Sequence, residues 1–154
     1  MARSDAVAPK AQIPNSALEP LAFLIGDWRT MGTHPVVPGK RLTGRTTFHW
    51  HEGGAFLIMR NEVDEPGFPD GVAIFGSDGG GGFRMIYFDE RGVSRVFEVE
   101  AGEGTVTWHR ADPQLAQSVT VTANERGDRL VSKGRMSENG GLWKDDLSQE
   151  FERE

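Results

Sequence analysis

The chain has 154 residues, a net charge of −6 and no cysteine. This length suits one domain with a single core, because a chain of this size can bury roughly 70% of its unfolded surface. Lys and Arg form no basic run, which argues against nucleic acid and anionic membranes as partners. The absence of cysteine excludes disulfides and thiolate metal sites. No apolar run approaches the roughly 20 residues of a membrane span, and the opening lacks the apolar middle of a secretory signal, so we expect a cytoplasmic protein.

The first elements in chain order are a lead-in and a helix. Residues 1–14 are rich in Ala and Pro and show no periodicity, which predicts a flexible segment before a single domain over 15–154. Asn15 or Ser16 can cap a helix of about two turns that ends at Gly26.

From Asp27 onward, short apolar and β-branched runs alternate with turn residues, and no stretch suits a second helix. Short links force neighbouring strands to be antiparallel, and closing so long a meander removes its exposed edges. The sequence therefore predicts an all-β fold, an up-and-down antiparallel barrel of roughly ten strands. The expected strands span 27–34, 42–51, 55–64, 71–77, 82–89, 93–99, 104–110, 117–123, 128–136 and 142–153.

Alternation along the strands predicts a partly polar interior. In the last strand, Asp145 and Gln149 share one face with Trp143, Leu147 and Phe151. Buried polar groups either satisfy one another or meet a polar ligand. A barrel of roughly ten strands has room for one small ligand. The candidate polar anchors are Asn61, Tyr87, Asp145 and Gln149, the candidate lining residues are Trp50, Met59, Met85 and Trp108, and His34 is placed near the barrel mouth.

Two short motifs near the ends of the expected barrel carry a resemblance. Leu21–Trp28 (LAFLIGDW) opens the β-region with a Gly-x-Trp, and Ser137–Trp143 (SENGGLW) precedes the last strand. With Gly53–Leu57 (GGAFL), they resemble a family of uncharacterised bacterial lipocalin-like proteins of the calycin superfamily, which is distantly similar to the haem-binding nitrobindins. The resemblance implies the same barrel fold.

The resemblance also implies a structural staple and a test for haem. In calycins a first-strand tryptophan closes one barrel end and a last-strand arginine lies across its ring, positions matched here by Trp28 and Arg153. Nitrobindins hold haem through a histidine close to the C-terminal strand, but residues 110–154 contain none. We therefore predict no cofactor and no haem held by that strand, which leaves His34 as the first alternative haem ligand.

The remaining histidines give no clear metal site. His49 and His51 share a strand face, but two ligands are fewer than the three of a catalytic zinc, and we predict no metal. If Phe48 and Trp50 point inward, both histidines face water.

No nucleophile or phosphate-loop motif is present, so the leading hypothesis is a binding module for a small, largely apolar ligand. One alternative is an enzyme that uses His34 or Asp145 for acid/base chemistry of an isomerase or hydrolase kind. Another is a homodimer whose barrel is filled by its own side chains.

Overall fold

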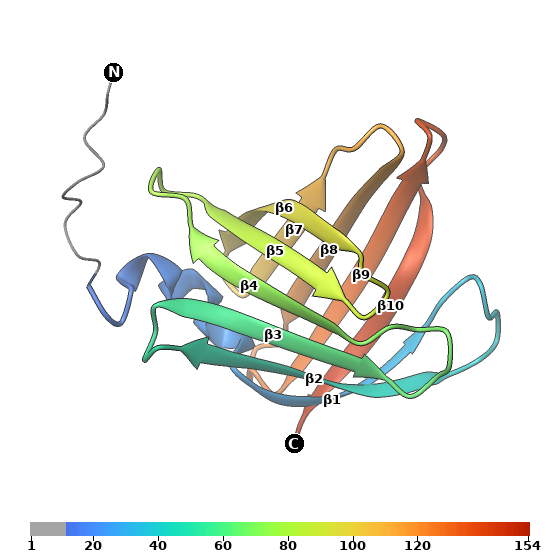
Figure 1. Cartoon of the computed structure of the whole chain (residues 1–154). Coiled ribbons are helices and arrows are strands. Elements are labelled where there is room, and N and C mark those ends of the chain that lie inside the picture. The colour runs from blue at the N-terminus through green and yellow to red at the C-terminus, as the bar shows by residue number, and fades with distance from the viewer. Residues whose placement is uncertain (1–11) are drawn as a thin grey trace.

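The structure is a computed structural model that describes residues 12–154. Within these residues, ten strands form one closed antiparallel barrel and a short helix covers one end (Figure 1). Each strand pairs with the next in sequence, and β1 pairs with β10 to close the barrel, which confirms the predicted fold. The elements are η1 (Ser16–Leu24), β1 (Gly26–Thr33), β2 (Leu42–His51), β3 (Phe56–Val63), β4 (Gly71–Ser77), β5 (Phe83–Asp89), β6 (Ser94–Gly102), β7 (Thr105–Arg110), β8 (Leu115–Ala123), β9 (Arg129–Glu138) and β10 (Lys144–Arg153). Most of the predicted flexible lead-in, residues 1–11, lies outside the described part of the chain.

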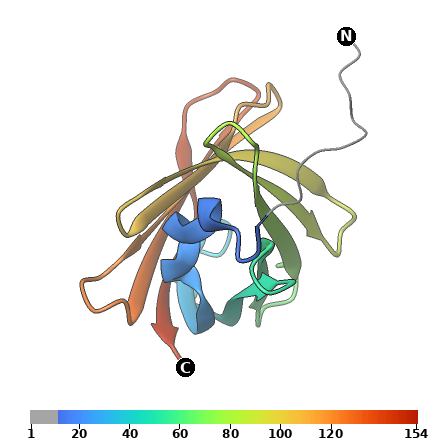
Figure 2. The ribbon, with the colours of Figure 1, turned by 90° about the vertical axis from the view of Figure 1, so that its left-hand side faces the viewer.

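The helix η1 closes one end of the barrel, as the view along that end shows (Figure 2). The Asn15 side chain caps it by accepting a hydrogen bond from the Ala17 N–H at 3.0 Å. The helix is of the 3₁₀ type, whose three-residue turn places every third side chain on one face. Leu18, Leu21 and Leu24 form this face and are fully buried in the barrel.

A contact between the first and last strands fixes the same end. Arg153 Cζ lies 4.2 Å from the centroid of the Trp28 ring. Arg153 Nη1 donates to the Ile25 carbonyl oxygen at 2.7 Å, and Trp28 Nε1 donates to the Leu24 carbonyl oxygen at 2.9 Å. Gly26 has a φ of 145°, and a Cβ at this position would collide with the Arg153 guanidinium. The expected Trp28–Arg153 contact is therefore present, and it connects the helix to both strands that close the barrel.

A bulge in β10 changes which side chains point inward. Asp145 pairs with Arg135 and Ser148 pairs with Lys133, so Asp146 and Leu147 together face Gly134. A Cβ on Gly134 would lie 2.5 Å from the Leu147 carbonyl oxygen. Glycine at this position therefore lets the bulge approach β9 closely.

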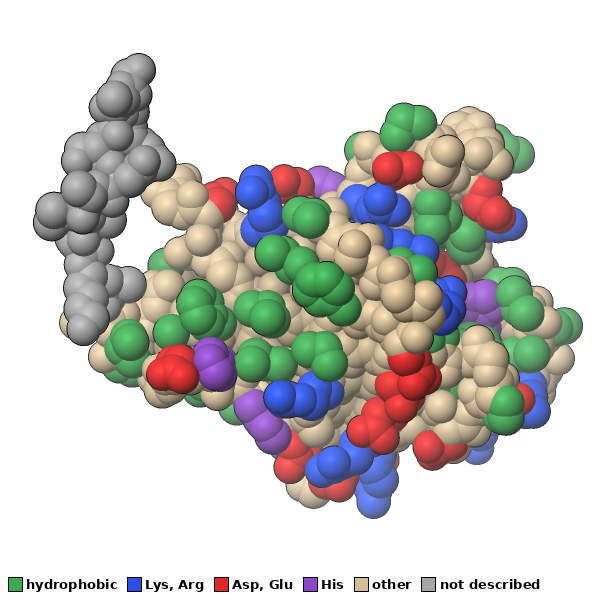
Figure 3. Space-filling view, in the orientation of Figure 1, with side chains coloured by type: hydrophobic (Ala, Val, Ile, Leu, Met, Phe, Trp, Pro, Cys, Tyr) green, Lys and Arg blue, Asp and Glu red, His purple; other side chains and the backbone are tan. Residues whose placement is uncertain are grey.

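The outer wall carries hydrophobic side chains over the middle of the sheet (Figure 3). The exposed members on β4 to β6 are Val72, Ile74, Ile86, Phe88 and Val96. They lie on the opposite side of the wall from the core residues, as strand alternation requires. None of the helices in the described residues is long and apolar enough to cross a membrane.

Candidate functional site

The barrel encloses a cavity of about 180 Å³. Its deeper wall is mostly apolar, and Trp108 lies edge-on to Phe75 with the ring centroids 5.6 Å apart. The apolar residues that line the cavity are Phe48, Met59, Met85, Phe97, Trp108, Val119, Val121, Leu147 and Phe151. A dry cavity of about 150 Å³ can hold benzene, so this space suits one ring or a short chain.

The cavity opens into a wider hollow of about 790 Å³ at the end opposite η1. The loops β1–β2 and β3–β4 border this mouth, and Lys40 Nζ joins them by an ion pair of 2.8 Å to Glu65. The inner cavity and the mouth share six lining residues, which are Asn61, Tyr87, Arg95, Gln117, Asp146 and Leu147. Five of the six are polar, so a polar ring separates an apolar interior from the mouth.

A histidine and a carboxylate form one side of this polar ring. His34 Nε2 lies 2.9 Å from Asp146 Oδ1, and both side chains are largely buried. The Val36 N–H donates to His34 Nδ1 at 3.0 Å. Because a backbone N–H can only donate, Nδ1 carries the lone pair and Nε2 carries the hydrogen directed at Asp146. Phe68 packs edge-on against the imidazole at 5.4 Å, which helps to hold the ring.

A second carboxylate, Asp89, is fully engaged on the opposite side. The Tyr87 hydroxyl donates to Asp89 Oδ2 at 2.8 Å, and Arg91 Nη2 donates to the same oxygen at 2.7 Å. The Arg91 guanidinium holds the pKa of Asp89 well below its usual range. Burial raises the pKa of Tyr87, and the hydrogen bond to Asp89 acts in the same direction, so this phenol stays protonated.

Several polar groups in the barrel have no partner. Asn61 Oδ1, Gln117 Oε1 and Thr46 Oγ1 are buried and accept or donate no hydrogen bond within the described residues. All three residues line the inner cavity. Native proteins leave few such groups unsatisfied, because each costs about 1 to 3 kcal/mol. These atoms are therefore the ones that a polar ligand would satisfy.

Arg95 brings a positive charge into the same ring. It lies on β6 in line with Phe97 and Val99, which point into the barrel, and it pairs across the sheet with Tyr87. Burial lowers the pKa of Arg95, and the charges of Arg110 and Arg91 add to this effect. Of the hydrogen bonds and ion pairs within residues 12–154, none involves the Arg95 side chain.

The structure brings most of the sequence-predicted site residues together. Met59, Met85 and Trp108 lie against the inner cavity, as does the buried amide of Gln149. Asn61 and Tyr87 belong to the polar ring, and His34 borders the mouth. Arg95, Gln117 and Asp146 are further members of the ring that the sequence reading did not single out. For Arg95 and Gln117 the signal was present, since each shares alternation with inward apolar residues.

Two expected positions are wrong. Asp145 does not point into the barrel: the bulge in β10 reverses the alternation, so its side chain is 74% exposed at the rim and lies 3.6 Å from Arg135 Nη1. Asp146 takes the inward place instead. Trp50 does not line the cavity, because it lies near the end of β2 on the η1 side of the barrel and is 36% exposed.

The remaining histidines lie on the outside of the barrel. His49 Nε2 is 2.7 Å from Asp27 Oδ1, and His109 is 3.7 Å from Glu100, with both imidazoles exposed. Within residues 12–154, no three His, Asp or Glu side chains cluster as metal ligands would. The residues of the barrel interior do not fit a haem: His34 is the one histidine at the cavity mouth, and both of its ring nitrogens are engaged.

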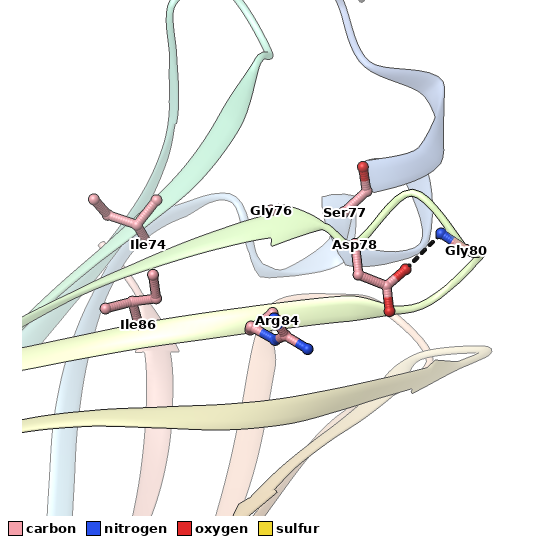
Figure 4. A pocket seen from close by; sticks show the side chains of 7 residues that line it. All are labelled: Ile74, Gly76, Ser77, Asp78, Gly80, Arg84 and Ile86. Atoms are coloured by element: carbon pink, nitrogen blue, oxygen red, sulfur yellow. Dashed lines mark hydrogen bonds between the residues drawn. The ribbon is translucent and has the colours of Figure 1, made fainter. Parts of the chain in front are cut away.

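A separate hollow lies on the outer wall between β4 and β5 (Figure 4). It is bounded by Ile74, Ile86 and Arg84 and by the hairpin that follows β4. The Asp78 carboxylate accepts hydrogen bonds from the N–H groups of Gly80 and Gly82 at 2.7 and 3.1 Å. These bonds lower the pKa of Asp78. This carboxylate stabilises a turn. The hollow is a depression in the outer wall and is not part of the barrel cavity.

The fold has a counterpart among solved structures. The crystal structure of Rv2717c from M. tuberculosis superposes with a TM-score of 0.63, and the match covers 90% of this chain and 98% of that chain. The two sequences are 17% identical, so the likeness shows the barrel fold alone. No protein-family model matches the chain, and no curated protein matches its sequence. The fold and site together define a closed β-barrel with an internal cavity that opens at one end.

Proposed function

We propose that this protein binds a small, largely apolar molecule inside its barrel. The observation that carries the proposal is the cavity itself, with an apolar interior behind a ring of polar side chains. Ligand sites commonly combine an apolar lining with a few polar groups that fix orientation. The unsatisfied oxygens of Asn61 and Gln117 supply such groups. The cysteine-free composition agrees with the cytoplasm as the compartment of this binding.

The experiment compares two Ser→Phe variants in native mass spectrometry of freshly purified protein. Ser132 is buried on β9 and lines the cavity, so Ser132→Phe places a large ring where the ligand would lie. Ser118 lies on β8 with its side chain on the outer wall, so Ser118→Phe makes the same change outside. We expect wild type and Ser118→Phe to retain a small molecule and Ser132→Phe to lose it. Retention by Ser132→Phe, with its far-ultraviolet spectrum unchanged, would contradict the proposal.

A second candidate is acid/base catalysis in the same cavity, which the 2.9 Å contact between His34 and Asp146 favours. In this arrangement Asp146 is the group able to accept a proton, because the His34 lone pair is already used by the Val36 N–H. Asp146→Asn keeps the size of the side chain and removes its basicity. If wild type converts a bound ligand and Asp146→Asn does not, the result would support catalysis. If both proteins bind the ligand without converting it, the protein would be a binding module.

A further inference from the structure

Arg95 is the feature of the mouth that the proposed function leaves unexplained. It lies in the polar ring between the apolar cavity and the open mouth. The other two guanidiniums nearby have partners: Arg91 binds Asp89 at 2.7 Å, and Arg110 donates to the Leu115 carbonyl oxygen at 2.9 Å. Arg95 has none within the described residues.

The carboxylates near Arg95 are engaged by other groups. Asp89 already accepts hydrogen bonds from Arg91 and the Tyr87 hydroxyl. Across the mouth, Asp146 binds His34 at 2.9 Å, and Lys144 binds Glu138 at 2.6 Å. A half-buried guanidinium without a carboxylate partner lowers the stability of the fold unless a ligand pairs with it.

We propose that Arg95 binds the carboxylate of an amphipathic monocarboxylic acid whose apolar part fills the barrel cavity. This inference rests on the proposed function and names the class of ligand. A guanidinium matches a carboxylate with two parallel hydrogen bonds, and Arg95 stands where the apolar lining gives way to the mouth. The Asn61 and Gln117 side chains lie in the same ring, and their amides carry N–H donors of the kind that a carboxylate accepts.

The charges around the mouth favour a carboxylate over a phosphate. One free guanidinium matches a single negative charge. On the opposite wall, Lys144 already binds Glu138 and His34 binds Asp146, so among the described residues this wall offers no second free cation for a dianion. The cavity of about 180 Å³ suits a ring or a short chain as the apolar part.

The experiment measures the binding of four probes by calorimetry at pH 7. The probes share an eight-carbon chain and differ in the polar group at its end: octanoate, octyl phosphate, octanol and octylamine. The proteins are wild type, Arg95→Gln and Arg84→Gln. Arg84 lies on β5 with its side chain on the outer wall, so Arg84→Gln removes the same charge away from the cavity.

We expect wild type to bind octanoate about tenfold or more tightly than octanol, because hydrogen bonds to charged groups are worth about 1.5 to 3 kcal/mol. Arg95→Gln should lower octanoate affinity to that of octanol and leave octanol affinity unchanged, and Arg84→Gln should behave as wild type. Octyl phosphate should bind more weakly than octanoate, and octylamine most weakly.

Equal binding of octanoate and octanol by wild type would overturn the inference and leave the proposed function standing. Loss of octanol binding in Arg95→Gln would also overturn it, since Arg95 would then support the fold. Tighter binding of octyl phosphate than of octanoate would overturn the choice of a carboxylate and indicate a dianionic ligand instead. Failure of all four probes would overturn the inference, and the Ser132→Phe comparison would separately decide the proposed function.

Discussion

The two ends of the barrel are built in opposite ways. At the closed end, η1 fills the opening with three fully buried leucines, and Trp28 Nε1, Arg153 Nε and Arg153 Nη1 each donate a hydrogen bond to a backbone carbonyl oxygen. At the open end, the Asn61 and Gln117 side-chain oxygens and the Arg95 guanidinium lie around the cavity and have no partner among residues 12–154. The residues of the closed end stabilise the fold. Those of the open end include polar groups that a bound ligand would supply with hydrogen-bond partners. The contrast supports the proposed binding site inside the open end.

The largest effect is expected at the closed end. Leu21→Ala should lower the free energy of unfolding by about 2 to 5 kcal/mol, because it leaves a cavity beneath a fully buried side chain. Leu142→Ala is the matched control, since Leu142 is 93% exposed at the open end. Urea denaturation measures both. A Leu21→Ala protein as stable as the control would mean that η1 is not part of the core.

The Trp28–Arg153 contact is the next test of the closed end. Arg153→Ala should cost about 1 to 3 kcal/mol, because it removes the contact with the indole and the hydrogen bonds to Ile25 and Gly127. Glu152→Ala removes exposed ion pairs worth about 0 to 1 kcal/mol and serves as the control. The double variant with Trp28→Phe should lose less stability than the sum of the single changes. Additive losses would show that the two residues do not interact.

Asp89 should make the stability of the open end depend on pH. Its pKa is lowered in the folded protein, while an unfolded Asp titrates near about 3.9. The stability it contributes is therefore complete above about pH 4 and is lost as the pH falls further. Asp89→Asn should cost about 1 to 2 kcal/mol at pH 7 and should flatten the acid limb of the stability curve. An acid limb identical to that of wild type would contradict this role.

The smallest expected effect is a gain at the open end. Gln117→Leu removes a buried oxygen that has no partner in the described part of the chain, so it should raise the free energy of unfolding by about 0.5 to 1 kcal/mol. Gln114→Leu makes the same change on the exposed β7–β8 loop and should have little effect. A destabilised Gln117→Leu protein would mean that this amide supports the fold, and the contrast between the two ends would weaken.

The sequence predicted the strands well, because glycine-rich turns and alternation are local signals. The Trp28–Arg153 contact followed from a family resemblance together with barrel closure. Asp145 was misplaced, because the bulge opposite Gly134 depends on how β9 and β10 pair, which alternation within one strand does not contain. Arg95 was overlooked although it alternates with Phe97, because its significance lies in the partners it lacks, and these appear only in three dimensions.

The tryptophans offer the most direct test of binding at the open end. The chain has four, and in an isotope-labelled protein each indole N–H gives its own signal, assigned by single Trp→Phe variants. Trp108 lines the cavity, Trp28 lies at the closed end, Trp143 is exposed after β9, and Trp50 is partly exposed on the η1 side. On titration with octanol, we predict that the Trp108 signal moves to saturation while those of Trp28 and Trp50 stay fixed. A fixed Trp108 signal, or equal movement of Trp28 and Trp108, would contradict a binding site inside the barrel that opens at the end opposite η1.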